Sequence, residues 1–161
     1  MAREYTISAS GVAIAGVTTL VFINPGVTMA LEILRVWVGQ SGALASANQR
    51  VQLVTQSTAF PTLTAFTPAK LKRNDPVSAI AGATTGAAGT AGINASLENA
   101  GPKTVIFEDA FNVLNGWLWV PTPRETIIMP ASSASGFGLF LPVAPGILTN
   151  WAFGMTFAEI G

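Results

Sequence analysis

The chain has no cysteine and no histidine, and its few charges are balanced between eight basic and eight acidic residues. Without cysteine there are no disulfides, thiolate nucleophiles or iron–sulfur ligands. Without histidine the chain lacks the commonest metal ligand and the commonest general base near neutral pH. A formal net charge of zero also argues against nucleic acid as a partner, since phosphates are bound by clustered Lys and Arg. These absences predict a chain with no catalytic residue, no metal site and no cofactor.

Apolar residues dominate what is present. Hydrophobic residues make up 50% of the 161 positions and charged residues only 10%, whereas an ordinary soluble domain is about 25% charged. The length suits one domain, and we predict a single domain over residues 1–161. A free monomer with little charge and no net charge is prone to associate. We therefore expect partners to cover much of the apolar surface.

Two long segments, Tyr5–Leu31 and Thr126–Ala158, contain no charged residue. A membrane-spanning helix needs about 20 consecutive apolar residues. The first segment is interrupted by Asn24-Pro25-Gly26 and the second by several prolines and serines, and neither has a basic flank. Glu4 beside Arg3, followed late by the apolar run, also argues against a signal peptide. We interpret both segments as sheet buried on two faces and expect no membrane partner.

Alternation of apolar and polar residues predicts β-strands along most of the chain. The last segment shows it best, because Trp151, Phe153 and Met155 fall on one face and small residues on the other. Helical periodicity is weak, and Pro and Gly turns separate the strands, so we predict an all-β fold, a β-sandwich of jelly-roll-like form. The nine predicted strands are Tyr5–Ala9, Thr18–Ile23, Leu31–Val38, Arg50–Gln56, Thr104–Glu108, Trp117–Val120, Thr126–Met129, Phe137–Leu141 and Trp151–Ala158.

The segment Thr67–Pro102 differs from the rest in composition. It begins with the densest charge in the chain and continues as a Gly/Ala/Thr tract without charge, Ala79–Ala95. So long a loop in a small domain is either functional or disordered when free. We predict one long loop or arm, residues 67–102, that orders against a neighbouring subunit; the alternative is a flexible surface loop with no role.

Two groups of residues are candidates for partner contacts. Lys70, Lys72 and Arg73 form a basic cluster that suits an acidic protein surface, although a solvated loop would look the same. Trp117 and Trp119 share one strand face, and Leu118 and Val120 share the other. If both faces are covered, the tryptophans belong to the core. If the tryptophan face is open, it is a subunit contact or a platform for stacking sugars.

The acidic residues offer no recognisable catalytic pair. Glu108 and Asp109 are adjacent, and neighbours on a strand point to opposite faces. Two distant carboxylates would suit a glycosidase, but the sequence singles out no such pair. We therefore predict that the protein is not an enzyme.

Four runs resemble small virion proteins of tailed bacteriophages: LEILRVWVGQSG (31–42), QRVQLVTQSTAFPTLTAFTPAKL (49–71), GWLWVPTPRETIIMPASSASGFGLFLP (116–142) and NWAFGMTFAEI (150–160). The style is also similar, being Ala/Gly/Thr-rich, free of cysteine and rich in strands. The class resembled is that of head decoration, or cement, proteins. The resemblance implies β-sandwich trimers on the outside of the capsid lattice, and it carries over no individual functional residue.

The leading hypothesis is a non-enzymatic virion structural protein at the phage capsid surface. It would associate with itself, as a trimer, and stabilise the head by contacts to the major capsid protein. The alternatives are a carbohydrate-binding module that uses Trp117, Trp119 or Trp151, a tail or minor capsid protein, and a membrane-associated protein.

Overall fold

The computed structural model describes residues 2–161, and every regular element in this range is a β-strand. The strands are β1 (Arg3–Val12), β2 (Thr18–Asn24), β3 (Ala30–Gln40), β4 (Asn48–Gln56), β5 (Thr62–Ala65), β6 (Ala69–Lys70), β7 (Ala81–Gly82), β8 (Thr90–Leu97), β9 (Lys103–Asn112), β10 (Trp117–Trp119), β11 (Ile127–Met129), β12 (Gly136–Leu141) and β13 (Trp151–Ile160). All nine strands predicted from the alternation are present, most of them longer than predicted.

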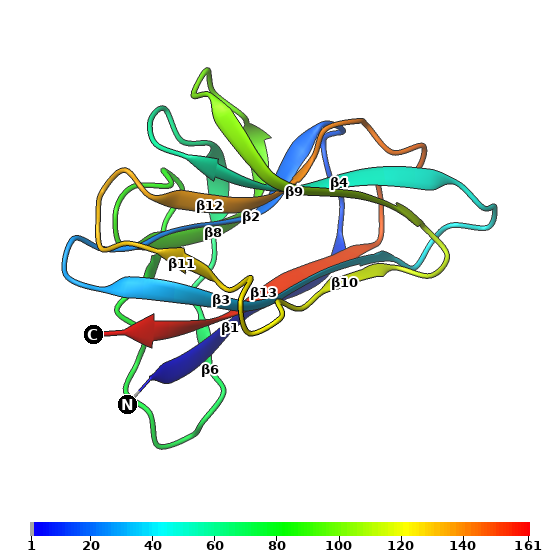
Figure 1. Cartoon of the computed structure of the whole chain (residues 1–161). Helices are drawn as coiled ribbons and strands as arrows, with labels where there is room; N and C mark the ends of the chain where they lie inside the picture. Colours follow the sequence, from blue (N-terminus) through cyan, green and yellow to red (C-terminus); the bar gives the residue numbers. More distant parts are fainter. Residues whose placement is uncertain (1) are drawn as a thin grey trace.

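The strands form two sheets that pack face to face (Figure 1). The first sheet has the order β10-β3-β13-β1-β6, with β11 also paired to β3. The second has the order β5-β8-β2-β12-β4-β9, with the short β7 paired to β8. Every pairing is antiparallel except that of β7 with β8. This confirms the prediction of an all-β sandwich.

The main strand pairs are nested in the sequence, so that strands near the start of the chain pair with strands near its end. The first strand, β1, pairs with the last, β13, and β2 pairs with β12. Inside these, β3 pairs with β10 and β4 with β9, so that β1 to β4 lie alternately in the first and second sheet. The residues between β4 and β9 form an insertion whose strands β8 and β5 extend the second sheet beyond β2.

The core lies between the two inner faces. Trp151, Phe153, Met155 and Phe157 of β13 are fully buried there with partners from every long strand. All seven residues of β2 are buried, because its other face is covered as well. There Phe22 packs with Leu63, Ala95 and Phe60 in a second, smaller cluster. The expectation that charge-free sequence is buried on both faces is therefore confirmed for β2 and wrong for β1, where Ser8 and Ser10 are exposed.

The predicted arm is corrected by the structure. Within residues 67–102, Thr90–Leu97 is strand β8, which pairs with β2 and β5 inside the second sheet. Ile80 is buried in the main core, and Glu159 Oε1 accepts hydrogen bonds from Ser78 Oγ and Ala79 N at 2.6 and 2.8 Å. Most of the tract Ala79–Ala95 therefore belongs to this domain's own sandwich. Strand pairing uses the backbone, and Gly, Ala and Thr side chains give little sign of it in the sequence.

Gly154 of β13 fixes the packing on the outer face of the first sheet. A Cβ at this position would collide with the Ile7 carbonyl oxygen and with the Trp37 ring. Trp37 lies over the glycine and carries the Arg35 guanidinium 5.2 Å from its ring centroid. Arg35 Nε in turn donates to Thr156 Oγ1 at 3.0 Å. The absence of a Cβ atom at Gly154 thus leaves room for the Trp37 ring over the sheet.

We expect Gly154→Ala to lower the free energy of unfolding by about 1–3 kcal/mol, because the new methyl group overpacks against the backbone of β1. Gly39, on the neighbouring strand β3, is the matched control, since nothing lies within 4 Å of a Cβ built there. Urea denaturation of the two variants measures the difference. Equal stability of the two variants would contradict the packing described at Gly154.

Candidate functional site

Strand β9 forms one edge of the second sheet and is exposed along most of its length. It pairs with β4 alone, and Val105, Ile106 and Phe107 in its middle are 44%, 44% and 39% exposed. The outer side of an edge strand carries backbone groups that no neighbour pairs, and apolar side chains there attract further contacts. The ladder with β4 is irregular at Ile106, which places Ile106 and Phe107 beside the same hollow.

The edge of the first sheet that lies next to β9 is also apolar. Strands β10 and β11 pair with β3 at its edge, and Leu118, Val120 and Ile128 are 62%, 59% and 59% exposed. We call the surface made by the exposed apolar residues of these edges the open flank. It consists of Val105, Ile106, Phe107, Leu118, Val120 and Ile128.

The two candidate tryptophans lie on the inner side of β10. Trp117 is opposite Val38 and Trp119 opposite Val36, and both are partly buried against the main core. Trp117 Nε1 donates to Asp109 Oδ2 of β9 at 3.1 Å. Because the tryptophans face the space between the sheets, the open face of this strand is the one that carries Leu118 and Val120.

A hollow of about 200 Å³ lies between the two edges of the open flank. Its lining residues are Ile106 and Phe107 from β9, Trp119 from β10, Ile127 from β11, and Glu125 from the intervening turn. The Glu125 carboxylate accepts a hydrogen bond from Thr122 Oγ1 at 2.9 Å. The hollow therefore offers apolar walls and one carboxylate at its side.

The other tryptophan named for sugar stacking is not accessible. Trp151 is fully buried, and its Nε1 donates to the Ile147 carbonyl oxygen at 2.8 Å. The interpretation of Trp151 as a sugar platform is therefore wrong.

The basic cluster lies at the far edge of the first sheet from the tryptophans. Lys70 ends β6, which pairs with β1, and Lys72 and Arg73 follow in an exposed turn. Lys72 Nζ is 3.7 Å from Glu4 Oε1. The structure thus places the cluster and the tryptophans at different sites, separated by the width of the sheet. Acidic residues close to the cluster reduce its positive field.

A buried polar group ties this region to the core. Tyr5 is fully buried, its hydroxyl donates to the Pro76 carbonyl oxygen at 3.2 Å, and Glu159 lies nearby with 3% exposure. Burial raises the pKa of Tyr5 above its ordinary value of about 10, and the negative charge of Glu159 raises it further. The neutral phenol is therefore the form that the fold requires.

This raised pKa predicts a loss of stability in strong alkali. A group whose pKa is raised by folding contributes its full stability below its unfolded pKa, and the contribution is lost as the pH rises through the folded value. Stability should therefore fall above about pH 10, and Tyr5→Phe should make this fall less steep. Tyr5 is the only tyrosine in the chain, so its ionisation can be followed directly by tyrosinate absorbance. An identical alkaline profile in both proteins would contradict this role of Tyr5.

Within residues 2–161, no three metal-ligating side chains lie close enough together to hold a metal ion. The same range contains no helix that is long and apolar enough to cross a membrane.

Comparison with known proteins adds no relative to these observations: no protein-family model, no curated protein sequence and no solved structure matches this chain.

Proposed function

We propose that this chain is a non-enzymatic virion structural protein, a decoration protein of a tailed-phage head. It acts at the capsid surface, where it associates with copies of itself as a trimer and binds neighbouring subunits of the major capsid protein. The observation that carries the proposal is the open flank, the group of exposed apolar side chains at the neighbouring edges of the two sheets.

The free energy available from burying the open flank can be compared with the cost of association. Its six side chains are each about half exposed, and complete burial of such a side chain contributes about 1.5–3 kcal/mol. Their burial together would contribute about 5–9 kcal/mol before costs. Association itself costs about 4–15 kcal/mol. One flank alone therefore binds weakly, and a stable complex needs several flanks that act together.

Oligomerisation joins several flanks in one complex, as stable binding requires. When copies are joined, binding of the second flank becomes intramolecular, and the overall affinity rises without any new contact. A repeating capsid lattice presents equivalent binding positions side by side. The weak single flank is thus consistent with a multivalent protein that binds an assembled shell in preference to a free subunit.

We also propose that the nested strand pairing is the winding of a jelly roll. The pairs β1–β13, β2–β12, β3–β10 and β4–β9 support it, with the insertion between β4 and β9 added at the side of β2. Jelly rolls occur in viral capsid domains and also in lectins. Because one fold serves several functions, the proposal depends on the surface and not on the winding.

The basic cluster has a secondary role in this proposal. Lys70, Lys72 and Arg73 are exposed and provide an electrostatic contact to an acidic patch of the capsid. Exposed ion pairs contribute little affinity but increase the rate and selectivity of encounter.

Removal of apolar side chains from the open flank tests the proposal. We expect Leu118→Ser combined with Ile128→Ser to reduce binding to phage heads at least tenfold, because both side chains are about 60% exposed and contribute to the contact. Val27→Ser is the matched control, since Val27 is 66% exposed in the β2–β3 turn, outside the flank. The experiment uses phage heads with which the wild-type chain co-purifies. It measures how many copies of each variant sediment with one head.

Two results would overturn the proposal. One is unchanged binding of the flank variant. The other is a wild-type chain that associates with no particle at any concentration and behaves as a compact monomer.

A carbohydrate-binding module is the second candidate, because Trp119 and the Glu125 carboxylate lie together in the hollow of the open flank. An aromatic ring beside a hydrogen-bond acceptor suits a sugar. Trp119 is partly buried against the core, which leaves little ring area for stacking. We expect no binding on a glycan array; a signal lost in Trp119→Ala and retained in Leu118→Ser would favour the sugar-binding function instead.

A further inference from the structure

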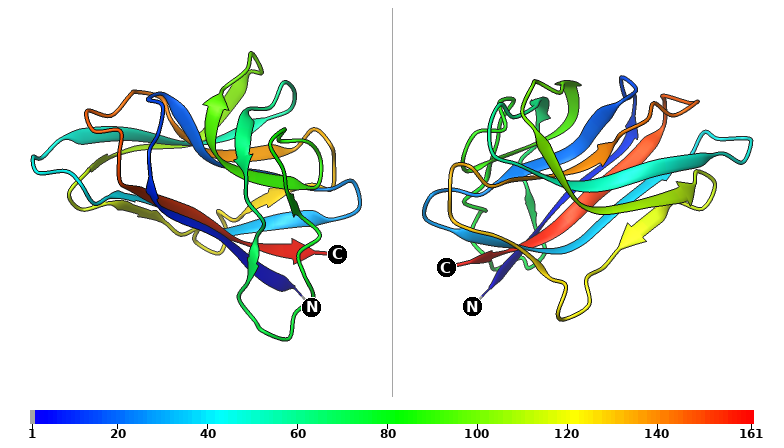
Figure 2. Two further views of the ribbon diagram at one scale, coloured as in Figure 1. Left: turned by 180° about the vertical axis from the view of Figure 1, so that it is seen from behind. Right: turned by 45° about the horizontal axis from the view of Figure 1, so that its top comes forward.

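Four loops meet at the end of the sandwich opposite the two chain termini (Figure 1, Figure 2). They connect β1 to β2, β3 to β4, β9 to β10, and β12 to β13. We call them together the apolar end. They comprise residues 13–17, 41–47, 113–116 and 142–150.

Backbone hydrogen bonds join these loops into one surface. Ile14 N donates to the Leu148 carbonyl oxygen at 2.8 Å, and Ser41 N donates to that of Asn150 at 3.0 Å. Val113 N donates to the Ala47 carbonyl oxygen, also at 3.0 Å. The first and second loops are thus each tied to the fourth, and the third is tied to the second.

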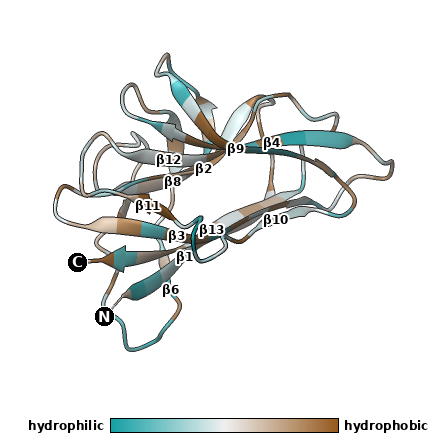
Figure 3. Ribbon diagram, viewed as in Figure 1, coloured by the Kyte–Doolittle hydropathy of each residue, from teal (hydrophilic) through white to brown (hydrophobic). Residues whose placement is uncertain are grey.

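None of the four loops contains a charged residue. The charges of the chain lie elsewhere, and many of them surround the termini, where Figure 3 shows hydrophilic residues at the start of β1 and near the end of β13. The apolar end instead carries exposed aliphatic side chains. They are Val17, Leu44, Leu114, Val143, Ile147 and Leu148.

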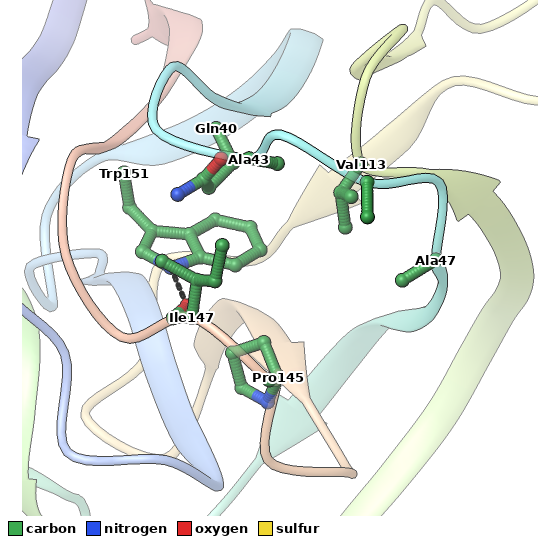
Figure 4. Close-up of a pocket in the computed structure, with 9 residues that line it drawn as sticks. Gln40, Ala43, Ala47, Val113, Pro145, Ile147 and Trp151 are labelled. Carbon is green, nitrogen blue, oxygen red and sulfur yellow. Dashed lines mark hydrogen bonds between the residues drawn. The ribbon is translucent and has the colours of Figure 1, made fainter.

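The apolar end contains a pocket of about 190 Å³ (Figure 4). Trp151 forms one wall, and Ile147, Pro145 and Val113 line the pocket with alanines from the β3–β4 loop. This size is comparable to that of an apolar protein cavity of about 150 Å³ that binds benzene. The pocket therefore has room for one branched apolar side chain.

The polar groups around the pocket are already hydrogen-bonded within the chain. Trp151 Nε1 donates to the Ile147 carbonyl oxygen, and Gln40 Nε2 donates to that of Thr149 at 2.9 Å. Gln40 Oε1 accepts from Gly42 N at 3.0 Å. An occupant gains no hydrogen bond from these groups, which favours an aliphatic or aromatic group without polar atoms.

A fitting group projects from the same surface. Leu44 is 98% exposed, and it lies between Ala43 and Ala45, both of which line the pocket. A leucine side chain in full contact with water is unfavourable in a free molecule. The same loop thus supplies one wall of an apolar pocket and an unpacked side chain of the type that the pocket accepts.

We propose that the apolar end binds a second copy of this chain, with Leu44 of each copy inserted into the pocket of another. This inference rests on the oligomer in the proposed function and names its contact. Insertion from each copy into the next gives a closed ring when the rotation between copies closes, and reciprocal insertion gives a two-fold pair.

Three properties favour a second copy as the occupant. Two identical faces repel when they are charged, and these loops carry no charge. The four loops also hold about as many residues as one side of a standard interface, roughly 20–30. Finally, the chain itself offers the knob as well as the hole.

A lipid surface fits the apolar end less well. Helices and loops that lie in a membrane interface combine apolar residues with Lys or Arg and with exposed Trp or Tyr. The four loops contain none of these four residue types, and the neighbouring Trp151 is fully buried.

Two variants separate the knob from the hole. Leu44→Ser removes the knob from a fully exposed position, and Ala47→Leu places a larger side chain in the pocket, toward which Ala47 points in Figure 4. Val27→Ser is the control, because it removes an exposed aliphatic side chain from the opposite end. Analytical ultracentrifugation over a range of concentrations gives the native mass of each protein.

We expect the wild-type chain and Val27→Ser to form the same oligomer. Leu44→Ser and Ala47→Leu should each weaken association at least tenfold, with unchanged far-ultraviolet circular dichroism. A mixture of the two variants should form complexes that neither forms alone, since one retains the hole and the other the knob.

A wild-type oligomer that persists unchanged in Leu44→Ser would overturn this inference and leave the proposed function standing. The same holds if both variants are monomeric and their mixture forms no complex. A wild-type chain that is monomeric at all concentrations would overturn the inference and the oligomer of the proposed function together. Sedimentation of the Leu118→Ser and Ile128→Ser double variant with phage heads remains the separate test of the open flank, since both side chains lie outside the four loops.

Discussion

The insertion of β13 between β1 and β3 is the constraint on which the rest of the structure depends. This last strand pairs with the first strand along one side and with β3 along the other. Its inner face places Trp151, Phe153, Met155 and Phe157 in the core, all fully buried. Its outer face brings Gly154 under Trp37. The two halves of the first sheet, β1 with β6 and β3 with β10 and β11, are joined only when the end of the chain is in place, so the domain folds through non-local contacts.

The same insertion creates both proposed contact surfaces. The loop that leads into β13 brings Ile147 and Pro145 to the apolar end, and Trp151 at the start of the strand forms a wall of its pocket. On the other side, β13 occupies the centre of the first sheet and leaves β3 to pair with the short strands β10 and β11 at the edge. Two short strands cannot cover the side of the sandwich, and the open flank results.

The sequence predicted the fold class and the nine strands because alternation records which side chains face a core. It failed for β8, where apolar residues do alternate, but two of the four, Ala91 and Ala95, are small, and the strand lies in a tract rich in Gly, Ala and Thr. The spacing of Trp117 and Trp119 predicts that they share one face of a strand, but which face lies open depends on the partner strand β3 and on the distance to β9. For Trp151, burial against the β12–β13 loop decides its role, and no local pattern reveals it.

The apolar end shows most clearly what a sequence hides. Charge-free runs were visible in Tyr5–Leu31 and Thr126–Ala158, and the fold explains only part of them by burial. Two of the four loops, residues 13–17 and 142–150, come from these runs, and the other two come from elsewhere in the chain. Their convergence follows from strand direction, since β1, β3, β9 and β12 all run toward this end. The four loops that share this end contain no charged residue, and Arg50 and Glu108 on the adjoining strands β4 and β9 are paired with each other. The end beside the termini carries Lys70, Lys72 and Arg73, while the loops at the opposite end have no charge to keep identical copies apart. This polarity gives the proposed oligomer a direction: copies meet at the apolar end, and the charged end, with both termini, remains on the outside.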